Sequence, residues 1–150
     1  MLTKRDFTVA AVTAGLTITF VLANSKTIPL DSSIFDWNEV AVKETKTGSV
    51  RTFFRSPTAT LDELECHVTT LNPDESSHPP HNHPEEEVII IKEGTLEALV
   101  NGKMKRVGPG SVVFQASNQT HSIRNVGTTP ATYHVFSWHA PGTMNPKAAK

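Results

Sequence analysis

The chain has 150 residues, of which 37% are hydrophobic and 19% are charged. Its 14 lysines and arginines against 15 aspartates and glutamates give a formal net charge of -1, so no basic field indicates a nucleic-acid partner. A single cysteine, Cys66, excludes an internal disulfide and a cysteine-rich zinc module. The 7 histidines include three between positions 78 and 83, and the composition favours a small β-rich domain with histidine chemistry.

The first 25 residues differ in character from the rest of the chain. A polar start, Thr3-Lys4-Arg5-Asp6, precedes an uncharged stretch at 7–23 that ends in small residues, which is the order typical of an export signal. The segment Thr3-Lys4-Arg5-Asp6-Phe7 also resembles a twin-arginine signal, with Lys4 in place of the first arginine. The sequence therefore predicts an export signal over residues 1–25 and a periplasmic or secreted protein. The alternative is an uncleaved N-terminal membrane anchor.

The remainder of the chain consists of short β-branched and aromatic runs separated by turn residues. Strands are expected at 50–55, 64–71, 87–92, 96–100, 103–107, 111–114, 121–126 and 131–138. Asn101-Gly102 predicts a two-residue hairpin with a type I′ turn. Residues 72–84 have the composition of a loop and residues 141–150 that of a flexible tail. The pattern predicts an all-β fold in one domain over residues 26–140.

Two histidines and a carboxylate precede the strand expected at 87–92. Because side chains alternate between faces of an extended chain, His81, His83 and Glu87 would point the same way. His121, in a later expected strand, could approach them from a neighbouring position. This spacing favours a metal site, and the alternative is a solvated histidine cluster in a loop.

The same segment carries a family resemblance. His81, His83, Glu87 and Gly94 are similar to the first motif of the cupin superfamily, G-x5-H-x-H-x3,4-E-x6-G. Glu75 stands where that motif begins with glycine.

The second cupin motif, G-x5-P-x-G-x2-H-x3-N, is matched farther along the chain. Gly110, His121 and Asn125 stand at its glycine, histidine and asparagine positions. Ala116 and Asn118 replace the usual proline and glycine, which puts the geometry of this turn in question more than the ligand set. The resemblance covers about residues 50–138 and implies a single jelly-roll β-barrel of two antiparallel sheets. It also implies one metal ion, held by His81, His83, Glu87 and His121.

The chemistry of this ligand set narrows the choice of metal. Imidazoles and a carboxylate without thiolate suit one divalent transition metal ion: Fe, Mn, Ni, Co, Cu or Zn. Four protein ligands on an octahedral ion leave two positions open, whereas a tetrahedral zinc would be full and structural. We therefore expect a metal-dependent, dioxygenase-like enzyme acting on a small organic molecule, with Glu87 as a catalytic proton carrier. Isomerase and lyase reactions are alternatives, and a non-catalytic module that binds or senses a metal or small ligand is a second class.

The strand expected at 131–138 offers candidate pocket residues. His134, Phe136 and Trp138 share one face, and they line the substrate pocket if this face is turned inward. In the reverse arrangement Tyr133 and Val135 face inward. The expected partners are a small molecule and a second copy of the chain in a homodimer. We expect no nucleic acid, and a membrane only through the N-terminal segment.

Three further side chains need an interpretation. His78 precedes Pro79-Pro80 and is expected at the rim of the loop. His67 lies in an expected strand, where it would be a wall residue with satisfied hydrogen bonds. Cys66 is interpreted as a small buried hydrophobic residue.

Overall fold

The computed structural model describes residues 28–144, so the export signal expected at 1–25 and most of the tail expected at 141–150 lie outside the described residues. Within this range the chain forms nine strands and no helix. None of the residues described belongs to a helix that could cross a membrane. The strands are β1 (Lys43–Thr45), β2 (Gly48–Ser56), β3 (Glu63–Leu71), β4 (Glu86–Glu93), β5 (Leu96–Val100), β6 (Lys103–Val107), β7 (Val112–Gln115), β8 (Ser122–Asn125) and β9 (Ala131–His139).

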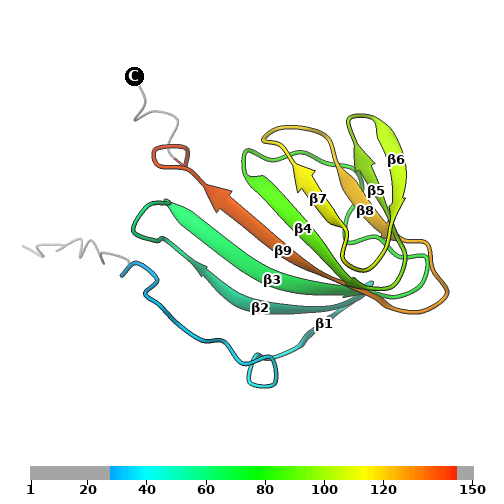
Figure 1. Cartoon of the computed structure of the whole chain (residues 1–150), viewed down its shortest axis with the longest axis horizontal. Coiled ribbons are helices and arrows are strands. Elements are labelled where there is room, and N and C mark those ends of the chain that lie inside the picture. Colours follow the sequence, from blue (N-terminus) through cyan, green and yellow to red (C-terminus); the bar gives the residue numbers. More distant parts are fainter. Residues whose placement is uncertain (1–27, 145–150) are drawn as a thin grey trace, which may run out of the picture.

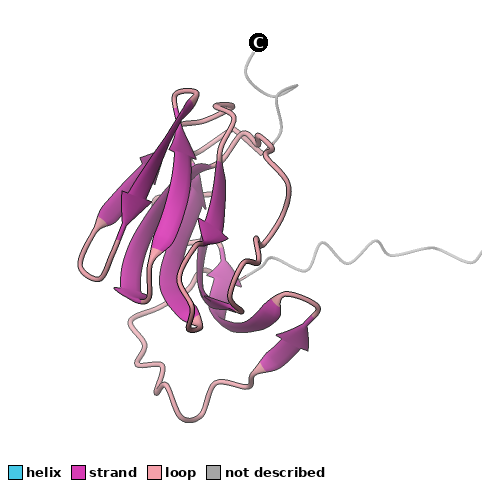
Figure 2. Cartoon of the chain, turned by 90° about the vertical axis from the view of Figure 1, so that its right-hand side faces the viewer, coloured by secondary structure: helices cyan, strands magenta, loops and turns pink. Residues whose placement is uncertain are grey.

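The strands form two antiparallel sheets. A six-stranded sheet has the order β1-β2-β3-β9-β4-β7, and a three-stranded sheet has the order β6-β5-β8. Figure 1 shows the long strands of the first sheet side by side and the second sheet beyond β4 and β7. Figure 2 shows the chain from the side, with loops connecting the strands throughout the described range. This is the all-β, double-sheet jelly roll expected from the sequence, although the sheets do not close into a complete barrel.

The core lies between the sheets and explains the strand pattern. In β4, Ile89 and Ile91 are 2% and 1% exposed, whereas Ile90 between them is 38% exposed. Burying one such side chain stabilises the fold by roughly 1.5–3 kcal/mol. The main core cluster comprises Leu71, Ile89, Ile91, Leu96, Ala98, Val113, Ile123, Ala131, Tyr133 and Val135. The eight strands predicted from the sequence are therefore present, each within two residues of its expected ends.

Two turns depend on left-handed backbone conformations. Asn101 and Gly102 have φ angles of 49° and 71°, which confirms the hairpin predicted between β5 and β6. Gly94, after β4, has φ of 86°, and a Cβ there would lie 2.4 Å from the Cβ of Ala131. Only glycine fits this second position, because both the backbone angle and the close approach of β9 exclude a side chain.

Candidate metal centre

Three histidines converge on one point at the inner side of the fold. Each of His81, His83 and His121 offers a ring nitrogen, and these nitrogens all lie within 4.8 Å of one another. His81 and His121 form an isolated antiparallel bridge, in which each main-chain N–H donates to the carbonyl of the other at 3.1 and 2.9 Å. Their rings are 4.6 Å apart between centroids. Main-chain pairing therefore brings together side chains that are far apart in the sequence.

His83 is positioned by the turn that follows β7. The main-chain N–H of Asn118 donates to the carbonyl of His83 at 2.8 Å, and the Ser117 hydroxyl donates to the carbonyl of Pro84 at 2.7 Å. Asn118 has φ of 58°, a conformation that asparagine tolerates better than most residues. Asparagine thus adopts the left-handed conformation at the position where the second cupin motif has glycine.

Main-chain carbonyls fix which nitrogen of each ring is free. The Nδ1 atoms of His81, His83 and His121 lie 3.1, 3.2 and 2.8 Å from the carbonyl oxygens of residues 79, 85 and 119 respectively. A carbonyl only accepts hydrogen bonds, so each Nδ1 carries the proton and each Nε2 offers a lone pair. The Nε2 of His121 is buried without a hydrogen-bond partner, so its lone pair fits the role of a metal ligand.

Glu87 lies next to this cluster, on the inner face of β4. Its Oε2 is 3.6 Å from Nε2 of His83, although it is outside the group of three nitrogens within 4.8 Å. Gln115, paired with Glu87 across β4 and β7, has a buried Nε2 without a partner. Three histidines could thus hold a metal ion, and a carboxylate beside them completes a donor set that fits a divalent transition metal.

A second layer of side chains supports His83. Oε2 of Glu85 lies 3.2 Å from Nδ1 of His83, and Oε1 of Glu85 lies 2.9 Å from Nε2 of His139. Burial alone would raise the pKa of the Glu85 carboxyl. The hydrogen bond to its own main chain and the charges of His139 and His83 together outweigh this effect, so the pKa is lowered. No sequence signal links His139 to the cluster, because β9 reaches it only through the order of strands in the sheet.

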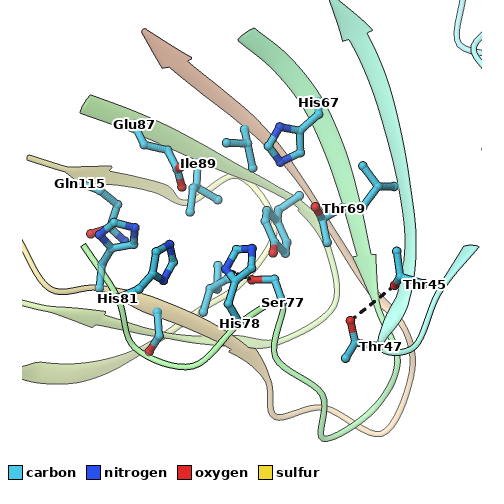
Figure 3. Close-up of a pocket in the computed structure, with 16 residues that line it drawn as sticks. Thr45, Thr47, His67, Thr69, Ser77, His78, His81, Glu87, Ile89 and Gln115 are labelled. Atoms are coloured by element: carbon cyan, nitrogen blue, oxygen red, sulfur yellow. Dashed lines mark hydrogen bonds between the residues drawn. The ribbon is translucent and has the colours of Figure 1, made fainter. Parts of the chain in front are cut away.

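The cluster faces a cavity of about 330 Å³ between the sheets. In Figure 3, Glu87, Gln115 and His81 lie at one side of this cavity and His67 lies apart from them. The cavity is lined by Thr45, Thr47, Val50, His67, Thr69, Ser77, His78, His81, Glu87, Ile89, Gln115, His121, Ser122, Ile123, Tyr133 and Val135. The mixture of imidazole, hydroxyl and aliphatic groups suits a small polar organic molecule.

Two more residues line the cavity: His78, which was expected at the rim of the loop, and Tyr133, which faces inward only in the alternative arrangement of β9. His78 lines the cavity with its ring 4.7 Å from that of His81, and burial, followed by the nearby charge of His81, lowers its pKa. Tyr133 is 2% exposed, and burial raises its pKa to about 12 despite hydrogen bonds with Ser77 and Thr69. Tyr133 is therefore a protonated phenol at neutral pH and can act as a hydrogen-bond donor.

The pocket residues expected on β9 need a correction. His134, Phe136 and Trp138 do not line this cavity, whereas Tyr133 and Val135 do. His134 instead packs on the outer face of the sheet, where its ring lies 6.3 Å from that of Trp37. In this reverse arrangement the segment before β1 contacts the outer face, where the ring of Trp37 packs against His134 and lies 6.2 Å from that of Phe53.

Comparison with known proteins agrees with this geometry. Residues 67–137 match the family model described as the cupin domain. The fold is therefore a cupin-type jelly roll, and residues 67–137 are similar to the cupin domain. A predicted oxalate decarboxylase from Thermotoga maritima superposes with a TM-score of 0.58 at 21% identity, covering 71% of this chain and 99% of that one. An RmlC-like cupin from Shewanella frigidimarina gives a TM-score of 0.60 at 15% identity, covering 73% and 94%.

One curated protein shares a segment with this chain. The dimethylsulfoniopropionate lyase DddQ of Ruegeria pomeroyi is 38% identical over 64 residues. The shared segment is 42% of this chain and spans only 31% of the length of the lyase.

Proposed function

We propose that this cupin domain is a metal-dependent enzyme acting on a small organic substrate. The observation that carries the proposal is the convergence of three histidine ring nitrogens beside a cavity that His81, His121 and Glu87 line. A structural metal site is sealed by its ligands, whereas a catalytic site keeps room beside the metal. His81, His83, His121 and Glu87 would hold the ion, which supplies a Lewis acid next to the bound substrate.

The residues of the chain supply the remaining chemistry. The phenol of Tyr133 donates a hydrogen bond to a substrate oxygen, since its raised pKa keeps the proton in place. Glu87 moves a proton at the metal end of the cavity. The aliphatic side chains of Ile89, Ile123 and Val135 limit the water around the substrate.

Two reaction classes are proposed for the site. Dioxygenase-like chemistry follows from a ligand set that leaves open positions on an octahedral ion. Lyase chemistry is supported by the segment shared with the dimethylsulfoniopropionate lyase. A non-catalytic binding or sensing module is the competing function.

Metal analysis and a substrate panel test the proposal. We expect purified protein to contain close to one equivalent of a divalent transition metal. The metal-loaded protein should then transform at least one member of a panel comprising a flavonoid, a diketone, a sugar acid and dimethylsulfoniopropionate. Oxygen consumption identifies the oxygenase, and product formed equally without oxygen identifies the lyase. Stoichiometric metal with ligand binding but no turnover would instead support the sensing module.

We also propose that the domain is exported and that residues 1–25 are its signal. Cell fractionation and N-terminal sequencing of the mature protein test this directly. A new N-terminus near residue 26 in the periplasm or medium is expected, whereas an intact N-terminus in the membrane fraction would identify the anchor. Sedimentation analysis of the same protein tests the proposed homodimer.

A further inference from the structure

The cavity contains one further histidine, His67, whose hydrogen-bond partner lies outside the three-histidine cluster. His67 lies on the inner face of β3, with Nδ1 3.0 Å from Oε1 of Glu65. The side chains of this pair are 23% and 19% exposed. His67 lines the cavity, and Figure 3 shows it on the wall away from Glu87 and Gln115. The imidazole is therefore available to a bound molecule at a distance from the metal cluster.

Glu65 is held as a carboxylate by its neighbours. The hydrogen bond with His67 lowers its pKa most, and the charge of Arg55 acts in the same direction. Arg55 lies 3.6 Å from Oε2 of Glu65 and forms a closer ion pair with Glu63 at 2.9 Å. A carboxylate accepts but does not donate, so Nδ1 of His67 carries the proton of the neutral ring. The second nitrogen, Nε2, is then a proton acceptor.

The placement of these groups favours catalysis over a purely structural ion pair. Neither Glu65 nor Arg55 lines the cavity, whereas His67 does, between the neighbouring wall residues Thr69 and Val135. An imidazole whose Nδ1–H is held by a carboxylate is the arrangement that orients a general base and stabilises the imidazolium it becomes. The cavity-lining position of His67 thus leaves its imidazole within reach of a bound molecule, while Glu65 stays outside the cavity.

We infer that His67 is a general base of the proposed enzyme, with Glu65 as its positioning residue. The substrate class is a small carbonyl compound or carboxylic acid with a C–H bond next to that group. Nε2 of His67 accepts the proton, and the electron pair of the C–H bond stays on the substrate. This inference rests on the proposed function, which supplies the Lewis acid for the carbonyl or carboxylate end.

The electron pair has two outcomes, and neither needs an oxidant or reductant. In an elimination the pair forms a C=C bond while a leaving group on the β-carbon departs with its bonding electrons, and water takes the proton from the imidazolium. In an isomerisation the imidazolium returns the proton to a carbon of the same molecule. Both outcomes require exchange or loss of the substrate C–H proton, which is directly measurable.

The experiment measures deuterium uptake and elimination by the full chain in D₂O. Protein loaded with Zn²⁺ or Fe²⁺ is incubated with pyruvate or dimethylsulfoniopropionate, and the small molecules are analysed by mass spectrometry. We expect the wild-type protein to act on at least one probe and His67→Gln to be slower by about 10²–10⁴-fold. His134→Gln, the same change on the outer face of the sheet, is the matched control and should stay within twofold of wild type.

Three readouts separate catalysis from structure. Metal affinity of His67→Gln by calorimetry should stay within twofold of wild type, since His67 is not in the three-histidine cluster. Added imidazole should increase the rate of His67→Ala at least tenfold. In Glu65→Gln, ¹⁵N spectra should show proton density moving from Nδ1 towards Nε2 of His67, with a loss of rate of about tenfold.

Particular outcomes would overturn the inference. Loss of metal binding in His67→Gln would make His67 part of the metal site, and an unchanged rate would remove it from the chemistry. Wild-type protein that binds metal but acts on neither probe would overturn the inference, and oxygen-dependent turnover elsewhere in the panel would leave the proposed function standing. Failure of the wild-type protein to bind metal would refute the proposed function itself.

Discussion

His121 gives the sharpest test of the metal centre, because its effects with and without metal differ. The side chain is 4% exposed, with Nδ1 bonded to a carbonyl at 2.8 Å and Nε2 buried without a partner. His121→Ala loses one hydrogen bond and some packing, together about 2–3 kcal/mol. It also removes a buried unsatisfied nitrogen that costs about 1–3 kcal/mol. Without metal, these two effects oppose each other, and the free energy of unfolding should therefore change by about 2 kcal/mol or less.

With metal, the two proteins should differ clearly. At free metal 1,000 times the dissociation constant, binding stabilises the wild-type protein by about 4 kcal/mol. If His121→Ala binds about a hundredfold more weakly, the same metal concentration stabilises it by only about 1.4 kcal/mol. Denaturant unfolding with buffered metal measures both values, and His134→Ala, outside the cavity, should keep the full wild-type effect. If metal raised the free energy of unfolding equally in His121→Ala and in wild type, the reasoning would be refuted.

Other residues give independent checks. Glu65 has a lowered pKa in the folded state, so its ionised form stabilises the fold above the ordinary value of 4.5, and this contribution is lost as the pH falls through the lowered value. The stability of Glu65→Gln should therefore lie about 1 kcal/mol below wild type at pH 7, and the two should converge in unfolding curves as the pH falls below the lowered pKa of Glu65. Burial raises the pKa of the single cysteine, Cys66, to about 11, so a disulfide reagent at pH 8 should modify it only slowly unless urea is added. Tyr133 is the single tyrosine, and an ultraviolet titration should show no phenolate until about pH 12 or unfolding. Gly94→Ala should lower the free energy of unfolding by about 3 kcal/mol in urea, since it combines an unfavourable φ with a clash against Ala131.

The strands could be predicted because each has an apolar face or a turn signal of its own. β1 was missed because Lys43–Thr45 is polar and fully exposed, and only its pairing with β2 makes it a strand. The face of β9 could not be decided, since both sets of alternating residues contain apolar or aromatic side chains. Trp37 contacts His134 on the outer face, and no local pattern in β9 indicates that contact.

His81, His83 and His121 were predicted as metal ligands from their spacing and the family resemblance, but the path of the loop that leads to them was not predicted. This loop brings His78 to the cavity because distant residues hold it in place. Ser76 bridges to Arg124, and the main-chain N–H of Asn125 donates to the carbonyl of Glu75 at 2.8 Å. These bonds join residues about fifty positions apart, so the path of the loop follows from the assembled fold and not from its own composition.

The hydrogen-bond partner of Nδ1 differs between the histidines of the cavity, and so does the chemistry that each can perform. His81 and His121 have Nδ1 on a main-chain carbonyl, which selects the Nδ1–H tautomer and leaves the Nε2 lone pair for a metal. His67 has Nδ1 on the carboxylate of Glu65, whose full negative charge stabilises the imidazolium formed when Nε2 takes a proton. A carbonyl dipole stabilises an imidazolium less than a carboxylate does. His81 and His121 are therefore suited to metal coordination, and His67 is suited to proton transfer. One cavity thus holds imidazoles prepared for two tasks, and exchanging the anchor of His67 for a neutral amide in Glu65→Gln should weaken proton transfer while leaving metal binding in place.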